Sequence, residues 1–427
     1  MPEPVTVSFL DPEWSHDTTD RKLASDAALR KFTEETGIRV NHLPAPESSP
    51  EQLALISQLL QKGTGSPDVL AIDVIWPRIL QQHLQDLKPD FTDEAASDDE
   101  ALLANFTVDG RLLATPYHTN IGVLSYRTDL LKEYGFPSPP RTWTELEKMA
   151  SRIQEGERAK GNGNFWGFVW PGTASEGLTC NALEWQYSQG GGQIVASNGT
   201  ITVNNPQAIR AWERAAHWVG WISPPSSLAY QEWDGTNAFH VSGNAAFIRG
   251  WTSEYVLSQP VKSPVSGRFG VTSVPGGEGG RVGVLGGFGL SVSRYSNHRA
   301  EAVRLVKFLV DREHQLETAR AQSGPPPWPQ LWDLPPILKA YARFAQPADG
   351  KRSSTLARPS TVTGEKYARV SRAYFQTVNA VLSGKAKAPE AAASLEKELV
   401  DITGFQPGPV GGSPADRRDD QSRLRCP

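Results

Sequence analysis

The chain has 427 residues, enough for two or three domains at roughly 100–200 residues per domain. Hydrophobic residues make up 38% and charged residues 21%, with 38 Gly and 33 Pro, which indicates a loop-rich globular protein and excludes a disordered or fibrous one. No apolar run reaches the roughly 18–20 residues that span a bilayer. A net charge of −4, from 43 Lys and Arg against 47 Asp and Glu, removes the usual electrostatic basis for binding nucleic acid or an anionic membrane, so we expect a neutral partner.

The cysteines provide neither a disulfide framework nor a metal or redox motif. Cys180 and Cys426 are the only two, and Cys426 lies in a polar C-terminal stretch. We expect Cys180 to be a small buried residue. Residues 1–4 lead directly into an apolar strand without the pattern of a signal peptide, so the chain is either cytoplasmic or a mature form.

The sequence pattern of the N-terminal third predicts alternating strands and helices. Hydrophobic periodicity and turn residues indicate strands over 5–10, 38–43 and 68–75, and helices over 21–35, ending at Gly37, and 50–62. This order predicts an α/β fold. Ligands of such sheets bind beyond the carboxyl ends of the strands, here near residues 11–20 and 73–76.

The middle of the chain carries a crossover between domains and a well-capped helix. Residues 110–126 are typical of two extended pieces joined at 116–120, where we place the crossover. Thr142 and Glu145 form a capping box that predicts a helix over 143–153.

The remaining pattern is mostly helical. We expect helices over 182–189, 206–219, 299–321, 367–382 and 389–402. Residues 325–336 hold six prolines and predict a stiff connector, and residues 406–427 lack apolar periodicity and predict a disordered tail.

Motifs of nucleophilic, metal or nucleotide chemistry are absent from the sequence. Residues 276–289 are rich in glycine but contain no phosphate loop and no complete dinucleotide fingerprint, and predict a turn with a tightly packed strand. No GxSxG or HExxH motif occurs, and the eight His are scattered, so we expect neither metal nor cofactor.

Carboxylates near predicted loops leave two function classes open. A glycoside hydrolase needs two of them across the scissile bond, whereas a sugar-binding site needs them to accept hydrogen bonds from hydroxyl groups. Asp68 follows a Ser-Pro turn and is expected to be structural, whereas Asp73 ends an apolar strand and is a better functional candidate. The wider set is Glu13, Asp17, Asp68, Asp73 and Asp234.

Tryptophan is unusually frequent, with 13 residues against 2 Met. Flat aromatic rings match the apolar C–H face of a pyranose, and carboxylates and amides match its hydroxyl rim. Six tryptophans lie in predicted loops or beside Gly and Pro and are candidates for this role: Trp14, Trp76, Trp166, Trp170, Trp251 and Trp328. Four others lie in or beside predicted helices and are expected to pack: Trp143, Trp212, Trp218 and Trp221.

Three segments are notable together: residues 116–131, residues 164–170 with 176–178, and residues 243–251. They resemble the extracellular solute-binding proteins of sugar ABC importers, in the branch of trehalose- and maltose-binding proteins (family 1). Weaker similarity at 73–76, 222–225, 285–289 and 357–359 extends the resemblance over about residues 5–405.

The resemblance implies a two-lobed periplasmic-binding-protein-like α/β fold of type II. Each lobe is expected to be a mixed sheet flanked by helices, and crossing hinge strands are expected to join the lobes. The implied N-terminal lobe comprises residues 1–117 and 268–323, and the implied C-terminal lobe comprises residues 121–264 and 328–405.

The resemblance also implies the ligand-binding residues. Asp73 matches an acid that binds sugar hydroxyls, Trp251 a stacking tryptophan and Arg358 a binding arginine. His118, Asn120 and Phe288 replace the Tyr, Asp and Trp of relatives, which keeps an aromatic or polar group but changes its hydrogen bonding. The full candidate set is Glu13, His16, Asp17, Asp73, Trp76, His118, Asn120, Glu232, Trp251, Gly287, Phe288 and Arg358.

We therefore expect a non-catalytic monomer that captures an α-linked glucoside such as trehalose or maltose between its lobes and delivers it to ABC-transporter permease subunits. It would act in the periplasm or outside the cell, associated with the membrane through the transporter. The alternative is a glycoside hydrolase that uses two carboxylates. The same fold with a polyamine or phosphorylated ligand is disfavoured by the aromatic residues and the near-neutral charge.

Overall fold

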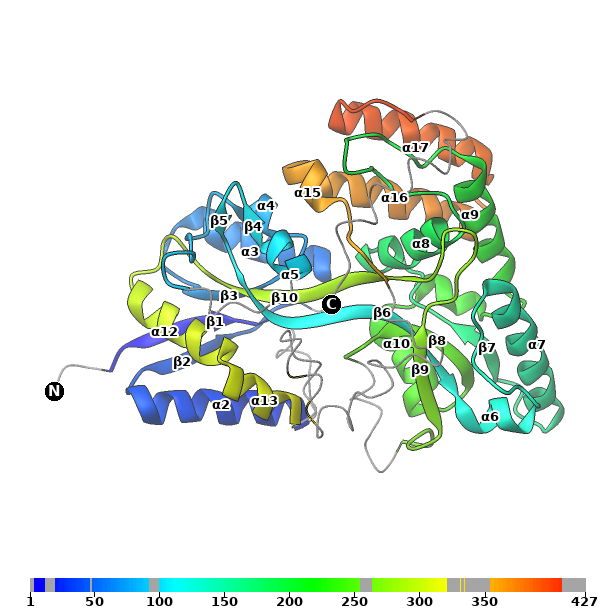
Figure 1. Ribbon diagram of the computed structural model, residues 1–427, viewed down its shortest axis with the longest axis horizontal. Coiled ribbons are helices and arrows are strands. Elements are labelled where there is room, and N and C mark those ends of the chain that lie inside the picture. The colour runs from blue at the N-terminus through cyan, green and yellow to red at the C-terminus, as the bar shows by residue number, and fades with distance from the viewer. Residues whose placement is uncertain are drawn as a thin grey trace. The chain divides into compact units, whose positions relative to one another are not determined.

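The computed structural model describes residues 4–11, 20–46, 48–91, 100–253, 263–320, 331, 334 and 354–408, and Figure 1 shows its helices and strands. The chain forms two compact units built from separate stretches of sequence. Unit 1 is mainly Met1–Asn120 with Gly286–Ala342, and unit 2 is mainly Ile121–Leu285 with Arg343–Arg425.

Unit 1 contains a mixed sheet in the order β2–β1–β3–β10. Strand β1 (Thr6–Leu10) pairs in parallel with β2 (Arg39–Leu43) and β3 (Val69–Asp73), whereas β10 (Val282–Val292) runs antiparallel to β3. The three strands expected in this region are confirmed. The first four residues of β3 are all buried, as expected for a strand whose two sheet faces are both covered.

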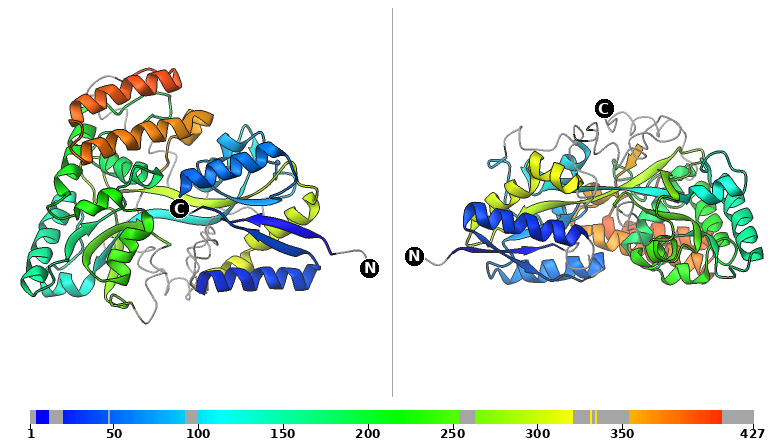
Figure 2. Two further views of the ribbon diagram at one scale, coloured as in Figure 1. Left: turned by 180° about the vertical axis from the view of Figure 1, so that it is seen from behind. Right: turned by 90° about the horizontal axis from the view of Figure 1, so that it is seen from below.

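Helices cover both faces of the unit 1 sheet. Figures 1 and 2 show α2 (Asp20–Thr36) with α12 (Arg299–Val310) and α13 (Arg312–Arg320) on one face, and α3 (Ser49–Lys62) on the other. The rings of Phe32 in α2 and Phe308 in α12 pack 5.3 Å apart. The remaining elements of unit 1 are α4 (Pro77–Leu80), α5 (Glu100–Phe106) and the paired short strands β4 (Thr107–Val108) and β5 (Arg111–Leu112).

The single helix expected over 299–321 is instead two helices, α12 and α13. Asp311 separates them with an extended backbone, ψ 141°, and its carboxylate accepts a hydrogen bond from the Glu313 N–H at 2.8 Å. Asp311 therefore caps the second helix. The apolar spacing continues on both sides of this cap, so periodicity alone did not reveal the break.

Strand β6 (Thr115–Arg127) is one continuous strand of 13 residues, so the expected joint between two extended pieces at 116–120 is wrong. Pro116 is its second residue, a position near a strand end where the missing N–H is tolerated. Both β6 and β10 contribute residues to unit 1 and to unit 2, so the chain passes between the units inside these two strands.

Unit 2 contains the other part of the sheet. Strand β6 pairs in an antiparallel manner with β8 (Ala245–Trp251) and with β9 (Phe269–Ser273), and β7 (Trp166–Val169) pairs in parallel with β8. The first residues of β10 pair with β11 (Ser354–Leu356). Because of these pairings residues 268–285 belong to unit 2, which differs from their expected place in the N-terminal lobe.

Helices form the rest of unit 2. Four helices pack on one another, namely α8 (Glu176–Ser188), α9 (Pro206–Trp218), α16 (Tyr367–Leu382) and α17 (Ala388–Thr403). Helix α7 (Trp143–Ala159) packs against β7 (Figure 1). The α7 capping box is confirmed, because the Glu145 N–H donates to Thr142 Oγ1 and the Thr142 N–H to Glu145 Oε2, each at 3.2 Å. The other helices are α6 (Thr128–Glu133), α10 (Glu232–Thr236) and α15 (Ser360–Thr363), with shorter turns at Pro225–Ala229, Asn237–Val241 and Gly364–Lys366.

Tryptophan rings form part of the unit 2 core. The ring of Trp218 lies 5.3 Å from that of Trp143 and 5.5 Å from that of Trp185, which in turn lies 5.1 Å from Trp170. Packing is confirmed for Trp143, Trp212 and Trp218. Trp170, a candidate ligand-facing ring, is fully buried, and Trp221, expected to pack, is 36% exposed.

The C-terminal end of the described chain is ordered further than expected. Ile201 N–H donates to Gln406 O at 3.0 Å, and Gly408 N–H donates to Ile201 O at 2.8 Å. The expectation of disorder is therefore wrong for residues 406–408, and residues 409–427 lie outside the described chain. No helix in the described chain combines the length and apolar character needed to cross a membrane.

Candidate ligand-binding site

Asp73 lies at the carboxyl end of β3, where it is paired with Phe288 of β10. The chain turns immediately after it, because Asp73 Oδ1 accepts a hydrogen bond from the Ile75 N–H at 3.1 Å and Asp73 O accepts one from the Trp76 N–H at 2.9 Å. This turn fixes the carboxylate of Asp73 at the strand end, the place where α/β sheets bind their ligands.

Trp76 and Phe288 form an aromatic pair beside this carboxylate. Their ring centroids are 6.4 Å apart and their planes are nearly perpendicular, at 86°. Trp76 is only 1% exposed, whereas Phe288 is half-buried. Trp76 thus packs against Phe288 from the buried side, and Phe288 is the residue of the pair with accessible surface.

Gly287 allows β10 to lie close to β6. Its φ of +119° is unfavourable for other residues, and a Cβ atom there would be 2.3 Å from the carbonyl oxygen of His118. The ring of His118 lies 3.8 Å from that of buried Tyr117. Asn120 is two residues further along β6, so its side chain points to the same face as His118. The structure therefore brings Asp73, His118, Gly287 and Phe288 onto three adjacent strands of unit 1.

Trp251 ends β8 in unit 2, opposite Gly122 of β6. The next residue, Thr252, binds β6 twice: the Ile121 N–H donates to Thr252 Oγ1, and the Thr252 N–H donates to Ile121 O, each at 3.1 Å. The Trp251 ring is half-buried, and the guanidinium carbon of Arg249 lies 4.2 Å from a ring centroid. Trp251 therefore has both a fixed backbone and partly accessible aromatic surface.

Arg358 follows β11 and is buried in a polar network of unit 2. Its Nη1 donates to Glu176 Oε1 at 2.9 Å, and Glu176 also accepts hydrogen bonds from Ser371 Oγ, at 2.6 Å, and from the Tyr367 hydroxyl. Burial, together with the nearby Glu176 carboxylate, raises the pKa of Tyr367 well above its usual value, so this hydroxyl stays protonated. Arg358 Nη2 also lies 3.5 Å from Leu285 O of β10.

A buried ion pair that was not predicted lies beside Trp251. Arg249 Nε donates to Glu184 Oε2 at 2.9 Å and Arg249 Nη2 donates to Glu184 Oε1 at 2.7 Å, with both side chains almost fully buried. The sequence held a signal for it, because Arg249 is a single charge inside an otherwise apolar strand and Glu184 is a single charge inside an apolar stretch of α8.

The other candidate residues are not part of these groups. Glu13, His16 and Asp17 lie outside the described residues, and so does the side chain of Glu232, the first residue of α10. The structural role of Asp68 is confirmed, since it accepts hydrogen bonds from Ser8 N, Ser8 Oγ and Ser296 Oγ at 2.5–2.8 Å.

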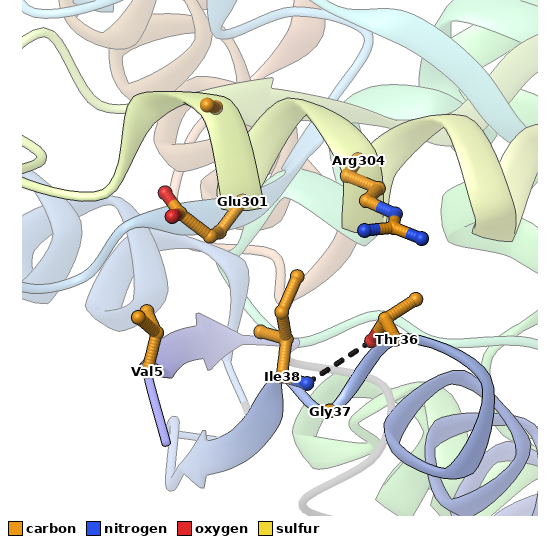
Figure 3. Close-up of a pocket in the computed structure, with 7 residues that line it drawn as sticks. Val5, Thr36, Gly37, Ile38, Glu301 and Arg304 are labelled. Carbon is orange, nitrogen blue, oxygen red and sulfur yellow. Dashed lines mark hydrogen bonds between the residues drawn. The ribbon is translucent and has the colours of Figure 1, made fainter. Parts of the chain in front are cut away.

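The structure also contains a shallow cavity of about 380 Å³ in unit 1, shown in Figure 3. None of the candidate residues lines it. Its lining comes from the start of β1, the α2–β2 turn and the first turns of α12, with Glu301 and Arg304 as its charged groups. Among the described residues, no group of three or more His, Cys, Asp or Glu side chains is arranged to hold a metal ion.

Comparisons with known proteins find relatives over most of the chain. A family model described as bacterial extracellular solute-binding protein matches residues 14–316. A probable ABC transporter-binding protein of Deinococcus radiodurans is 40% identical over 402 residues, which is 94% of each chain.

Solved structures support the fold. A maltose-bound T. maritima MalE3 has a TM-score of 0.84 and 29% identity, covering 93% of this chain and 100% of that one. The acarbose-binding GacH receptor of Streptomyces glaucescens has a TM-score of 0.78 at 22% identity, covering 94% and 99%. The two-lobed α/β fold expected from the sequence is confirmed.

Proposed function

Because the chain belongs to the bacterial extracellular solute-binding protein family, we propose that it captures an α-linked glucose disaccharide, maltose or trehalose, and delivers it to the membrane subunits of an ABC importer. It would do so outside the cytoplasmic membrane, as a non-catalytic monomer. Carriage to an importer is supported by the name of the Deinococcus radiodurans relative.

The ligand class rests mainly on the maltose-bound T. maritima structure, the most similar in fold among the structures compared above. The residues of the candidate site are chemically suited to such a sugar. Phe288 and Trp251 offer aromatic faces for the apolar side of a pyranose, and Asp73 offers charge-assisted acceptors for its hydroxyl groups.

The polar residues complete the proposed recognition. Asn120 can donate and accept, so it can bind a hydroxyl group in either sense, and His118 can do the same in its neutral form. Arg358 is a donor only, and its anchoring by Glu176 would hold the guanidinium ready for a sugar oxygen. Gly287 would contribute close approach of the backbone rather than a side chain.

We propose that the ligand contacts residues of both units and thereby stabilises one conformation of the protein. Asp73, His118, Asn120, Gly287 and Phe288 belong to unit 1, and Trp251 and Arg358 belong to unit 2. A ligand shifts a conformational equilibrium only by its difference in affinity for the two states, and contacts from both units supply such a difference.

A panel of disaccharides tests the proposal. We expect maltose or trehalose to raise the unfolding temperature, since a ligand at 100 times its dissociation constant adds about 2.7 kcal/mol to stability. Lactose and cellobiose, which are β-linked, serve as controls and should have little effect. The absence of a shift with every α-glucoside would contradict the ligand class, and release of glucose on incubation would instead favour a hydrolase.

A further inference from the structure

The ion pair between Glu184 of α8 and Arg249 of β8 is bidentate and almost completely buried. Its two hydrogen bonds measure 2.9 and 2.7 Å, and the exposed fractions of the side chains are 0% and 1%. Taking two charges out of water is unfavourable, so a buried ion pair is weak evidence for added stability. Its retention needs another reason, such as fixing one geometry.

The ion pair rests directly on the two strands that continue into unit 1. A Cβ atom on Gly122 of β6 would lie 2.0 Å from Glu184 Oε1 and 2.5 Å from Arg249 Nη2, so only glycine leaves room for the pair. Glu184 Oε1 also accepts a hydrogen bond from the Val284 N–H of β10 at 2.9 Å. Glu184 is thus held by β8 and β10 and lies against β6.

Arg249 in turn covers one face of the Trp251 ring. The two residues are two apart in β8, so their side chains lie on the same side of the strand. The guanidinium carbon lies 4.2 Å from a ring centroid, a cation–π distance, while the ring as a whole is only half-buried. A cation that Glu184 holds in place therefore backs this ring.

We propose that Glu184 and Arg249 are positioning residues for the ring of Trp251. Glu184 fixes the guanidinium of Arg249, and the guanidinium fixes the ring plane before any ligand arrives. The consequence for sugar binding rests on the proposed function, in which the other face of the ring stacks on a pyranose. Ordering the ring in advance removes a cost that binding would otherwise include.

The orientation of the ring is tested without ligand. The protein is labelled with 5-fluorotryptophan, and the Trp251 resonance is assigned with Trp251→Phe. We expect Arg249→Lys to shift and broaden this resonance, because lysine keeps the charge but loses the planar fork.

The matched control is Arg158→Lys, since Arg158 lies 4.3 Å over the Trp166 ring. It should move the Trp166 resonance and leave that of Trp251 in place. An unmoved Trp251 resonance in Arg249→Lys overturns the proposal.

Glu184→Gln with Arg249→Met keeps the test available if Arg249→Lys does not fold. This double variant removes both buried charges together and retains an acceptor for the Val284 N–H. The same displacement of the Trp251 resonance is expected, and its absence counts against the proposal.

The effect on binding is measured by calorimetric titration with maltose in two backgrounds. We expect Arg249→Lys to weaken binding by about 3- to 30-fold in the parent protein, and by less than about twofold when Trp251 is already alanine. Equal losses in both backgrounds would mean that Arg249 acts through the general fold, which overturns the positioning role. If the parent binds no sugar of the panel, the proposed function fails, while the fluorine spectrum still decides this proposal.

Discussion

Two tryptophans predicted to meet the ligand have different surroundings in the structure. Trp76 is buried and packs edge-on against Phe288, so its contribution to a binding site is indirect. Trp251 is half-buried and backed on one face by Arg249. The same residue type next to a strand end thus has two different surroundings, and burial distinguishes them.

Trp251→Ala should weaken maltose binding by about 1–3 kcal/mol, or roughly 5- to 150-fold, as for other aromatic anchors. The reason is the loss of the only large apolar surface that β8 offers at its end. Calorimetric titration measures the change. Trp221→Ala is the control, because Trp221 is not one of the candidate ligand-binding residues. It is 36% exposed, and its ring lies 4.9 Å from that of His217. Equal affinity of Trp251→Ala and the parent would remove the stacking role.

We expect the buried His240 side chain to make the free energy of unfolding depend on pH. It is buried against the rings of Phe239 and Phe269, and burial lowers its pKa to about 3. In the unfolded chain its pKa returns to roughly 6.5. As the pH falls from about 6.5 towards about 3, the unfolded state therefore binds a proton that the folded state does not, and the free energy of unfolding should fall by about 1.4 kcal/mol per pH unit.

Urea unfolding between about pH 7.5 and about pH 4.5 checks this dependence against His240→Phe, which keeps an aromatic ring but cannot titrate. Burial also lowers the pKa of His314, but that residue is present in both proteins, so the difference between the two slopes belongs to His240. Identical slopes would show that His240 becomes protonated in the folded state.

At the scale of elements, the close contact of β10 with β6 depends on glycine. Gly287 has φ +119° and lies against the His118 carbonyl, Gly283 lies against the Gly122 carbonyl, and Gly289 lies against the ring of Phe106. The glycine-rich stretch predicted as a turn with a tightly packed strand is confirmed. These contacts, rather than a phosphate-binding loop, explain its composition.

Gly287→Ala should lower the free energy of unfolding by about 2 kcal/mol or more, because the new methyl group would meet a carbonyl oxygen and the backbone conformation is unfavourable. Gly384→Ala is the matched control, since Gly384 has φ +72° and open space around it. It should cost about 1 kcal/mol from conformation alone. Urea denaturation measures both, and equal losses would show that β10 moves away from β6 at little cost.

At the scale of the whole molecule, two features matter: the division into two units and the two strands shared between them. The chain passes from unit 1 to unit 2 inside β6 and returns inside β10. Continuous strands limit how the backbone can bend. We therefore expect a ligand that contacts both units to change the backbone conformation near Asn120 and Leu285, where the chain passes between the units.

We expect the radius of gyration, measured by small-angle X-ray scattering, to fall when saturating maltose is added, as in hinge closure around a ligand. Trp251→Ala at the same maltose concentration should show a smaller fall, because less of it is bound. Cellobiose serves as the control sugar. An unchanged radius with calorimetrically confirmed binding would argue against closure.

The sequence by itself located several helices and indicated several local roles. Periodicity located α2, α3, α9, α16 and α17, and the Thr142 capping box located the start of α7, because these signals depend on residues close together in the chain. The Ser-Pro turn likewise indicated the structural role of Asp68, and the resemblance indicated the fold class.

Only the tertiary structure decided how distant residues meet. It made β6 one strand, split the expected helix at Asp311, and paired Glu184 with Arg249 under the ring of Trp251. Local sequence patterns indicate the secondary structure and which face of an element is buried. They do not indicate which side chain, distant in sequence, forms an ion pair with a buried charge. The Glu184–Arg249 pair joins residues that are 65 positions apart in the chain, which is why no local pattern predicted it.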